Sequence, residues 1–139
     1  MRKYIFCCMA LSLLSSVVLG AEPCAPDFAS FLLKFESSRE FQRQNTSFPL
    51  SATYVDGSAE PEPITVKYKI RSTSDPKYSR AIYPSKEKQA AIPFEKLVSS
   101  KQKQFLVKFT KPDTDYSFEF SFEKTSSCWQ LVKFEDYSL

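Results

Sequence analysis

Acid–base chemistry in this chain has to come from carboxylates, lysines or tyrosines, because the sequence contains no histidine. That absence excludes Ser-His-Asp and Cys-His triads and every zinc site with a histidine ligand. Free carboxyls ionise near pH ~4 and tyrosine near pH ~10, so acid–base catalysis at neutral pH would need a strongly perturbed group. Asp27, Glu36 and Glu40 lie on or near the first predicted helices. Their positions fall outside the apolar face of the first helix, so we expect their side chains to point to water.

Two groups of carboxylates come closest to a metal site. Asp113, Asp115 and Glu119 could bind a hard cation, but calcium loops supply more oxygen ligands at a tighter spacing, with a glycine at the bend. The chain has only two glycines, which also argues against a glycine-rich phosphate loop. We interpret this stretch as a solvated turn, give Glu135 and Asp136 the same interpretation, and expect no metal, cofactor or catalytic residue.

The N-terminal segment predicts export. Arg2 and Lys3 precede an apolar and small-residue run of 15 residues, Ile5–Leu19, and then Gly20 and Ala21. This is the pattern of a signal peptide, and the run is shorter than the roughly 20 residues of a membrane span. We expect residues 1–21 to be the signal, 22–139 to form a single domain, and the protein to be periplasmic or secreted. Cys24 is a poor match to a lipoprotein cysteine, since Ala21, Glu22 and Pro23 precede it.

Two cysteines remain after removal of the signal, one near each end of the mature chain. Cys24 and Cys128 are 104 positions apart, and an isolated pair in an oxidising compartment predicts a disulfide. Two free buried thiols are the alternative. The mature chain has 17 basic and 16 acidic residues, without the concentrated basic surplus of nucleic-acid-binding proteins.

Helices are expected first and paired strands later. Asp27 fits the N-cap of a helix with one apolar face, formed by Phe28, Phe31, Leu32 and Phe35. A second helix is expected from Ser38 around Phe41, with Pro49 ending the helical region, and a short helix from Pro93 with Phe94, Leu97 and Val98 on its apolar face. Alternating apolar and polar residues predict strands at 64–70, 105–110 and 116–122. A short strand is also expected at 51–55, and a last strand at 129–134 after a turn at 125–127.

This order predicts an α+β domain in which a curved, mainly antiparallel sheet wraps an aromatic inner face around N-terminal helices. We expect the first helix to pack on that face against Tyr68, Phe118, Phe120 and Trp129. On the outer face, ion pairs are expected if the strands 64–70 and 116–122 are neighbours, and the residues concerned are Lys67, Lys69, Arg71, Glu119 and Glu123.

Two stretches resemble a known family. They read DFASFLLKFESSREFQRQNTSFPL, from Asp27, and CWQLVKFEDYS, from Cys128. Together they resemble exported bacterial proteins with the domain of unknown function DUF4348, a family similar to the NTF2-like (cystatin-like) superfamily. Phe41, Gln42, Phe48 and Pro49 match the family pattern, whereas Asn45 stands where the family has an arginine. The resemblance implies helices in the concavity of a strongly bent sheet, a fold that often leaves a pocket between helix and sheet.

Three functions remain open at this point. The leading one is non-catalytic binding of an unknown protein or small ligand in the cell envelope, for example as an immunity-type protein, without nucleic acid and with membrane contact only through the signal. Gln42, Arg43 and Asn45 are the candidate partner-binding residues, because they form a polar segment beside Phe41 and Phe48. The other two functions are a small pocket enzyme that uses carboxylate and tyrosine, and a structural subunit that forms a homodimer through its sheet. Five tyrosines offer hydroxyls to a pocket: Tyr54, Tyr68, Tyr78, Tyr83 and Tyr116.

The export hypothesis predicts a mature N-terminus at Ala21 or Glu22, because the small residues at the end of the apolar run suit a signal peptidase. Mass spectrometry of the protein recovered from the envelope or the medium measures that terminus directly. An intact Met1 on protein recovered from the cytosol would contradict both export and the disulfide argument.

Overall fold

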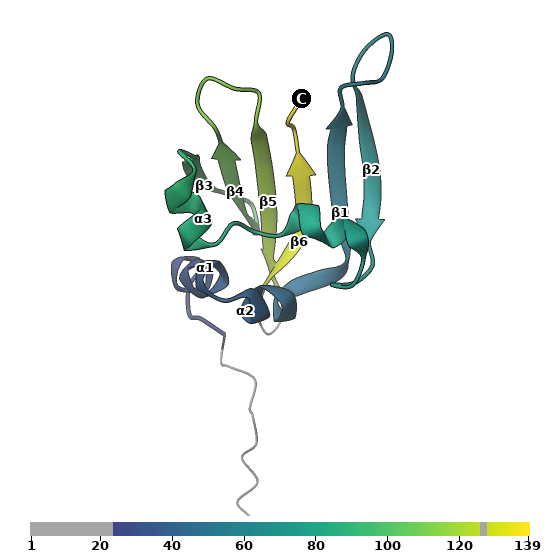
Figure 1. Ribbon diagram of the computed structural model, residues 1–139. Coiled ribbons are helices and arrows are strands. Elements are labelled where there is room, and N and C mark those ends of the chain that lie inside the picture. Colours follow the sequence, from purple (N-terminus) through teal and green to yellow (C-terminus); the bar gives the residue numbers. More distant parts are fainter. Residues whose placement is uncertain (1–23, 126–127) are drawn as a thin grey trace, which may run out of the picture.

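One six-stranded sheet has helices on one of its faces (Figure 1). The computed structural model describes residues 24–125 and 128–139, so the predicted signal at 1–21 lies outside the described residues. The elements, in chain order, are α1 (Phe28–Ser37), α2 (Arg39–Gln44), β1 (Thr46–Asp56), β2 (Ile64–Ile70), the 3-10 helix η1 (Pro76–Ala81), α3 (Lys86–Ala91), β3 (Glu95–Lys101), β4 (Gln104–Thr110), β5 (Ser117–Lys124) and β6 (Trp129–Asp136).

The strands lie in the order β2-β1-β6-β5-β4-β3. Only the β1–β6 pair is parallel, because the last strand inserts beside the first, and the other four pairs are antiparallel. The predicted α+β class, with N-terminal helices packed on a mainly antiparallel sheet, is confirmed. Among the described residues, no helix has the length and apolar character needed to cross a bilayer.

Helix α1 begins where the sequence predicts it to begin. The Asp27 side chain accepts a hydrogen bond from the backbone N–H of Ser30 at 2.8 Å and caps the first turn. Phe31 and Phe35 are fully buried, and both rings meet Phe122 on β5, at centroid distances of 5.9 and 5.1 Å. The apolar stripe is therefore part of the core.

The prediction of which residues α1 packs against is only partly correct. Phe28 packs on Trp129 at 5.2 Å, as predicted. Phe118 and Phe120 lie further along β5, where their ring neighbours include Phe109 instead of the α1 rings. The helix covers only the Phe122 end of β5, so the remaining inner positions are covered by other elements. Tyr68 lies on β2 beside Tyr54.

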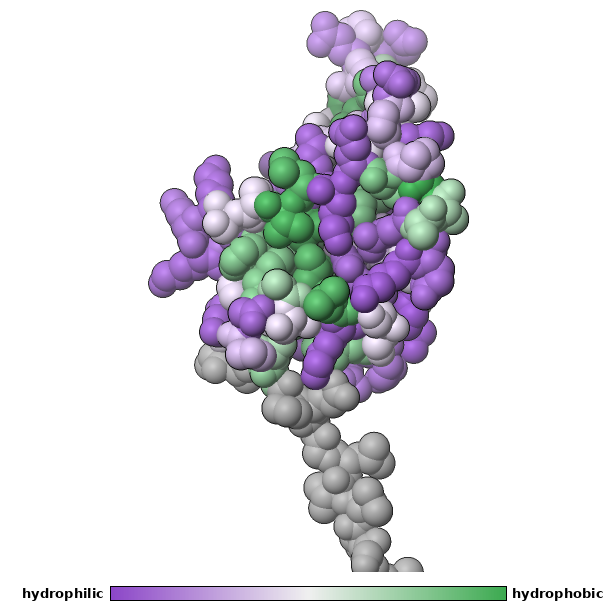
Figure 2. All heavy atoms as spheres, turned by 90° about the vertical axis from the view of Figure 1, so that its left-hand side faces the viewer, coloured by the Kyte–Doolittle hydropathy of each residue, from purple (hydrophilic) through white to green (hydrophobic). Residues whose placement is uncertain are grey.

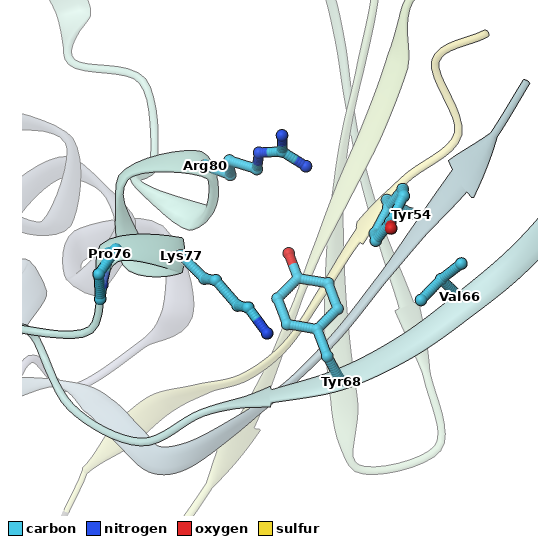
Figure 3. A pocket seen from close by; sticks show the side chains of 6 residues that line it. All are labelled: Tyr54, Val66, Tyr68, Pro76, Lys77 and Arg80. Carbon is cyan, nitrogen blue, oxygen red and sulfur yellow. The ribbon is translucent and has the colours of Figure 1, made fainter. Parts of the chain in front are cut away.

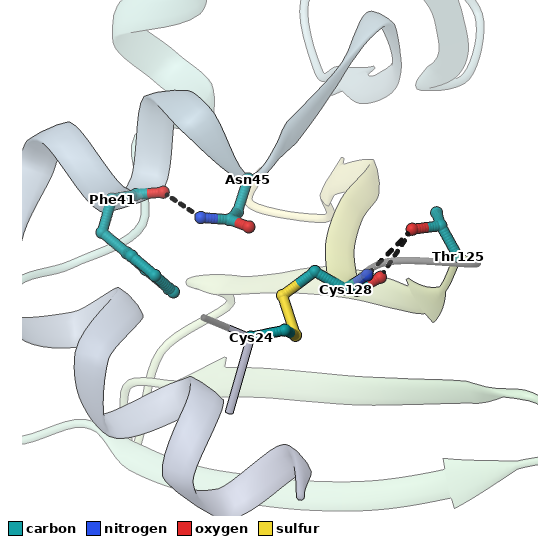
Figure 4. Close-up of a disulfide and its surroundings, with 5 residues drawn as sticks. All are labelled: Cys24, Phe41, Asn45, Thr125 and Cys128. Atoms are coloured by element: carbon teal, nitrogen blue, oxygen red, sulfur yellow. Dashed lines mark hydrogen bonds between the residues drawn. A yellow bond between two sulfur atoms is a disulfide. The ribbon is translucent and has the colours of Figure 1, made fainter. Parts of the chain in front are cut away.

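The predicted disulfide is confirmed. Cys24 and Cys128 are bonded, with their Cα atoms 5.3 Å apart, and they tie the segment before α1 to the start of β6 (Figure 4). The backbone N–H of Cys128 donates to Thr125 Oγ1, and that hydroxyl donates to the Cys128 carbonyl at 2.7 Å. Closing a loop of 104 residues removes ~4.7 kcal/mol of unfolded-chain entropy in the loop-closure description.

Pro49 does not end the helical region. Helix α2 ends at Gln44, and β1 already begins at Thr46, so the predicted strand 51–55 is the second half of a longer one. The register between β1 and β6 shifts between Thr46 and Ser51. Pro49 lies inside that irregularity, where its missing N–H removes no regular ladder bond.

The helix predicted from Pro93 is wrong. The short helix α3 ends at Ala91, and Glu95–Lys101 form the edge strand β3. A two-residue turn at Gln102 and Lys103, with Gln102 at φ 57°, folds β3 onto β4. Pairing with β4 therefore overrides the helical spacing of residues 94, 97 and 98.

The other edge strand, β2, also differs from expectation. Ile70 is fully buried, but Ile64 is 53% exposed, so only the Ile70 end of the apolar face of β2 reaches the core. The conditional outer-face ion pairs do not form, because β1 and β6 lie between β2 and β5. Lys69 donates to Ser51 on β1 instead.

Replacing Phe31 with alanine is expected to lower the free energy of unfolding by about 3–5 kcal/mol, because Phe31 is 0% exposed and packs among aromatic rings. Leu33→Ala on the same helix is the matched control, since Leu33 is 55% exposed and its loss should cost within ~0.5 kcal/mol. Chemical denaturation of both variants measures the difference, and equal losses would contradict the assigned face.

Candidate functional site

The 3-10 helix η1 positions two cations over the inner face of the sheet. Asp75 caps it, accepting hydrogen bonds from the backbone N–H groups of Lys77 and Arg71 at 3.0 and 3.1 Å. A 3-10 helix has three residues per turn, so Lys77 and Arg80 share one side. Tyr78 and Ala81 are buried, which anchors η1 to the core and leaves the cationic side free.

A pocket of about 370 Å³ lies between η1 and the strands β1 and β2 (Figure 3). Lys77 Nζ is 5.3 Å from the centroid of the Tyr68 ring, and Arg80 Cζ is 5.7 Å from that of Tyr54. The two tyrosine rings meet edge to face at 5.9 Å. The lining consists of Tyr54, Val66, Tyr68, Pro76, Lys77 and Arg80.

The Tyr68 hydroxyl has no partner in this pocket. Its oxygen is buried and makes no hydrogen bond, and Figure 3 shows it pointing between the η1 cations. Burial raises the pKa of Tyr68, although the positive charge of Arg80 opposes that shift. The hydroxyl therefore stays protonated at neutral pH and can donate to an acceptor.

A second hollow of about 190 Å³ shares Arg80 with the first. Arg39, Arg80 and Lys88 contribute three cations to its lining, against one carboxylate, Asp136. Its apolar wall is formed by Ile82 together with Tyr116, Phe118, Phe120 and Phe134. Positive charge therefore predominates in this lining, although residues 22–139 as a whole have 17 basic and 16 acidic residues.

The three predicted partner-binding residues do not form one surface. Gln42 is 2% exposed, and its amide donates to the Phe35 carbonyl at 2.7 Å and accepts from Arg39. Gln42 is therefore a packing residue, and its predicted presentation to a partner is wrong. The sequence pattern did not indicate that Gln42 is buried, because the backbone groups to which its side chain donates come close to it only in the folded chain.

Asn45 and Arg43 have different surroundings. The Asn45 side chain donates to the Phe41 carbonyl at 2.9 Å and closes the end of α2 (Figure 4). Arg43 is exposed, lies 3.5 Å from Glu40, and lines a hollow of about 240 Å³ on the α2 side of η1. A partner-binding role for Arg43 stays a prediction.

Glu36 is buried, which corrects the expectation that it points to water. It is 4% exposed and accepts hydrogen bonds from the Tyr83 hydroxyl at 2.9 Å and from Lys96 Nζ at 2.8 Å. Burial and the negative charge of Glu36 raise the pKa of Tyr83, so this tyrosine is a permanent donor. The carboxylate is thus held by two partners from distant parts of the chain.

The carboxylates of the β4–β5 hairpin do not converge with the pocket. Asp113 and Asp115 are exposed at the turn, and Glu119 lies on the outer sheet face, opposite Glu135 and Lys108. Burial, followed by the charge of Glu135, raises the pKa of Glu119. Within residues 24–125 and 128–139, no group of three or more Asp, Glu, Cys or His residues could hold a metal ion.

Sequence reasoning identified part of the pocket. Tyr54 and Tyr68 were among the five tyrosines considered, whereas Tyr78 and Tyr83 are buried in the core. Lys77 and Arg80 were missed because they fall in a stretch interpreted as a loop. Their three-residue spacing after Asp-Pro was the one available signal for a short helix with a cationic side.

Comparisons with known proteins support the fold. The sequence matches no protein-family profile and no curated protein. It is similar in structure to an NTF2-like protein from Bacteroides fragilis NCTC 9343, with a TM-score of 0.56 and 17% sequence identity. The match covers 86% of this chain and 49% of that one, so this chain spans about half the length of the solved protein. The NTF2-like fold implied by the resemblance is confirmed.

Two tyrosine-to-phenylalanine changes should have opposite consequences. Tyr68→Phe removes a buried hydroxyl without a partner and is expected to leave the free energy of unfolding unchanged or slightly higher. Tyr83→Phe removes a donor from buried Glu36 and is expected to cost about 1–3 kcal/mol. Chemical denaturation compares the two, and a loss at Tyr68 as large as that at Tyr83 would show that the Tyr68 hydroxyl has a structural partner.

Proposed function

We propose that this protein is a non-catalytic binding protein that takes a small anionic ligand with a planar apolar part into the η1 pocket. The observation that supports this best is the pocket itself, where Lys77 and Arg80 stand opposite the rings of Tyr54 and Tyr68. Ligand sites in proteins typically combine apolar walls with a few polar groups that fix orientation.

The charges in and around the pocket favour an anion. Arg80 has a guanidinium fork suited to two carboxylate or phosphate oxygens, and Lys77 adds a compact second charge. Asp136 is the one carboxylate in the lining of the adjoining hollow, where it faces three cations. An anionic ligand would be attracted by this excess and would also accept a hydrogen bond from the unpartnered Tyr68 hydroxyl.

The rings favour a planar apolar body on that anion. Tyr54, Tyr68 and Val66 all line the pocket, and their side chains give it its apolar surface. A pocket of about 370 Å³ suits a compact molecule. We therefore name the ligand class as small aromatic or planar carboxylates, with inorganic phosphate as the contrasting probe.

Binding is favoured over catalysis by the placement of the acidic groups. A catalytic carboxylate would have to face the pocket with a free lone pair. Glu36 is instead enclosed by Tyr83 and Lys96, and Glu119 is on the opposite face of the sheet. Asp136 lines the adjoining hollow among three cations and accepts a hydrogen bond from the Ser138 N–H at 3.0 Å. The tyrosine and carboxylate enzyme considered from the sequence has no comparable support.

We further propose that the chain is an exported protein of the DUF4348 type that acts in the periplasm or outside the cell. The Cys24–Cys128 disulfide supports an oxidising, non-cytoplasmic compartment. Phe41 and Phe48 of the family pattern both pack on or in the core, as residues that specify a fold would.

Titration of the protein with benzoate is expected to show saturable binding, with a clearly weaker response to the neutral isostere benzamide. Arg80→Gln should weaken benzoate binding roughly tenfold to a hundredfold, because a hydrogen bond to a charged group is worth about 1.5–3 kcal/mol. Isothermal titration calorimetry measures the affinities, and NMR of the tyrosine ring protons locates the site.

Lys67→Gln is the matched control, since Lys67 is an exposed cation on β2, and its position opposite Thr53 places it on the outer face of the sheet. It should leave benzoate binding unchanged. Equal benzoate affinity in the wild type and Arg80→Gln would contradict the proposal. Tight binding of phosphate without benzoate would contradict the planar apolar part of the ligand class.

A further inference from the structure

The edge strand β3 is exposed along its whole length. All seven residues of Glu95–Lys101 are exposed, including Leu97 at 63% and Val98 at 42%. Within the described residues β3 pairs only with β4, so its other side has no strand neighbour. A long exposed edge with apolar residues is a template for pairing with another strand.

The backbone groups available on this edge can be identified from the hairpin. The pair Lys101 and Gln104 flanks a two-residue turn and therefore exchanges its hydrogen bonds within the hairpin. Along an antiparallel strand, alternate residues direct these groups to opposite sides. The N–H and C=O groups of Lys96, Val98 and Ser100 therefore point away from β4.

We propose that β3 pairs with β3 of a second copy of this chain, forming an antiparallel two-fold dimer centred on Val98. In that register Val98 lies opposite itself, Lys96 lies opposite Ser100, and Glu95 lies opposite Lys101 at both ends. In this register, the backbone groups of β3 that point away from β4 are the ones that form the hydrogen bonds between the two copies. The seven residues are self-complementary in charge, which is what a two-fold interface requires.

The opposite edge of the sheet lacks this complementarity. Strand β2 also has seven residues, Ile64–Ile70, and its full antiparallel register with a second copy is centred on Lys67. That register places Lys67 opposite itself and Thr65 opposite Lys69. Like charges directly opposite each other destabilise a strand pair, so β2 is protected against self-pairing where β3 is not.

The surface around β3 supports a second copy as the occupant. Figure 2 views the side of the molecule that contains β3 and α3 and shows hydrophobic surface gathered there. Leu97 and Val98 contribute to the exposed apolar residues, and Lys96 is held to the core through Glu36 at 2.8 Å. The edge is therefore fixed in position before any partner arrives.

Sedimentation velocity of the exported form is expected to show a concentration-dependent dimer. Glu95→Lys or Lys101→Glu alone should weaken dimerisation roughly tenfold or more, because each places two like-charge pairs in the interface. The double charge swap Glu95→Lys with Lys101→Glu should restore it. Lys67→Glu on β2 is the control and should have no effect.

Cross-linking tests the register independently. Val98→Cys is expected to give a disulfide-linked dimer under mild oxidation, because residues directly opposite in a hydrogen-bonded pair have Cα atoms ~5.5 Å apart, within disulfide range. Leu97→Cys should not cross-link, since residue 97 would lie opposite Ser99 of the second copy. A monomer at the highest soluble concentration would overturn the proposal, as would a dimer insensitive to both charge changes or one cross-linked by Leu97→Cys alone.

Discussion

The burial of Tyr83 is the constraint on which the arrangement of this protein depends. Its ring contacts Phe35 from α1 and Phe109 and Phe120 from the sheet, at centroid distances of 4.8 to 5.4 Å. Its hydroxyl donates to Glu36, and its carbonyl accepts from Arg39 at 2.9 Å. One residue thus joins both N-terminal helices to the inner face of the sheet. Because Tyr83 follows η1 by two residues, this anchor also decides where η1 lies.

The position of η1 explains why a cationic pocket forms in a chain whose charges nearly balance. The short helix buries Tyr78 and Ala81 and leaves Lys77 and Arg80 over the strands β1 and β2. Figure 1 shows α1 and α2 at a different part of the inner face from η1, and Tyr54 and Tyr68 line the pocket between η1 and the strands β1 and β2. The proposed ligand site is therefore the part of the inner face that the helices leave uncovered.

The same buried cluster also orders one edge of the sheet. Lys96 is the second partner of the Glu36 carboxylate and holds β3 to α1, although every residue of β3 is exposed. Burying a carboxylate is costly unless its oxygens are paired, so Tyr83 and Lys96 both stabilise the fold here. The disulfide acts at the other end of α1, where it joins Cys24 to Cys128, the residue directly before β6. Helix α1 is thus tied at its start by a covalent bond and at its end by a buried polar cluster.

The sequence by itself determined the features that depend on local chemistry and on period. Asp27 and Ser38 predicted two helix starts, the 3.6-residue spacing of the phenylalanines predicted the buried side of α1, and strict alternation predicted the strands β2, β4 and β5. Cys24 and Cys128 predicted the disulfide, since the expected removal of residues 1–21 leaves no other pairing open to them. These features need no knowledge of which strand neighbours which.

Only the tertiary structure decided the features that depend on non-local neighbours. Phe94, Leu97 and Val98 have helical spacing, yet pairing with β4 makes residues 95–101 an edge strand. Glu36 and Gln42 are polar in the sequence and buried in the fold, because Tyr83 and Lys96 reach Glu36, and the Tyr83 carbonyl reaches Gln42, across long separations. The insertion of β6 beside β1 separated β2 from β5 and prevented the expected ion pairs. The spacing of apolar residues shows which face of a helix or strand is apolar, but it does not show which other helix or strand packs against that face.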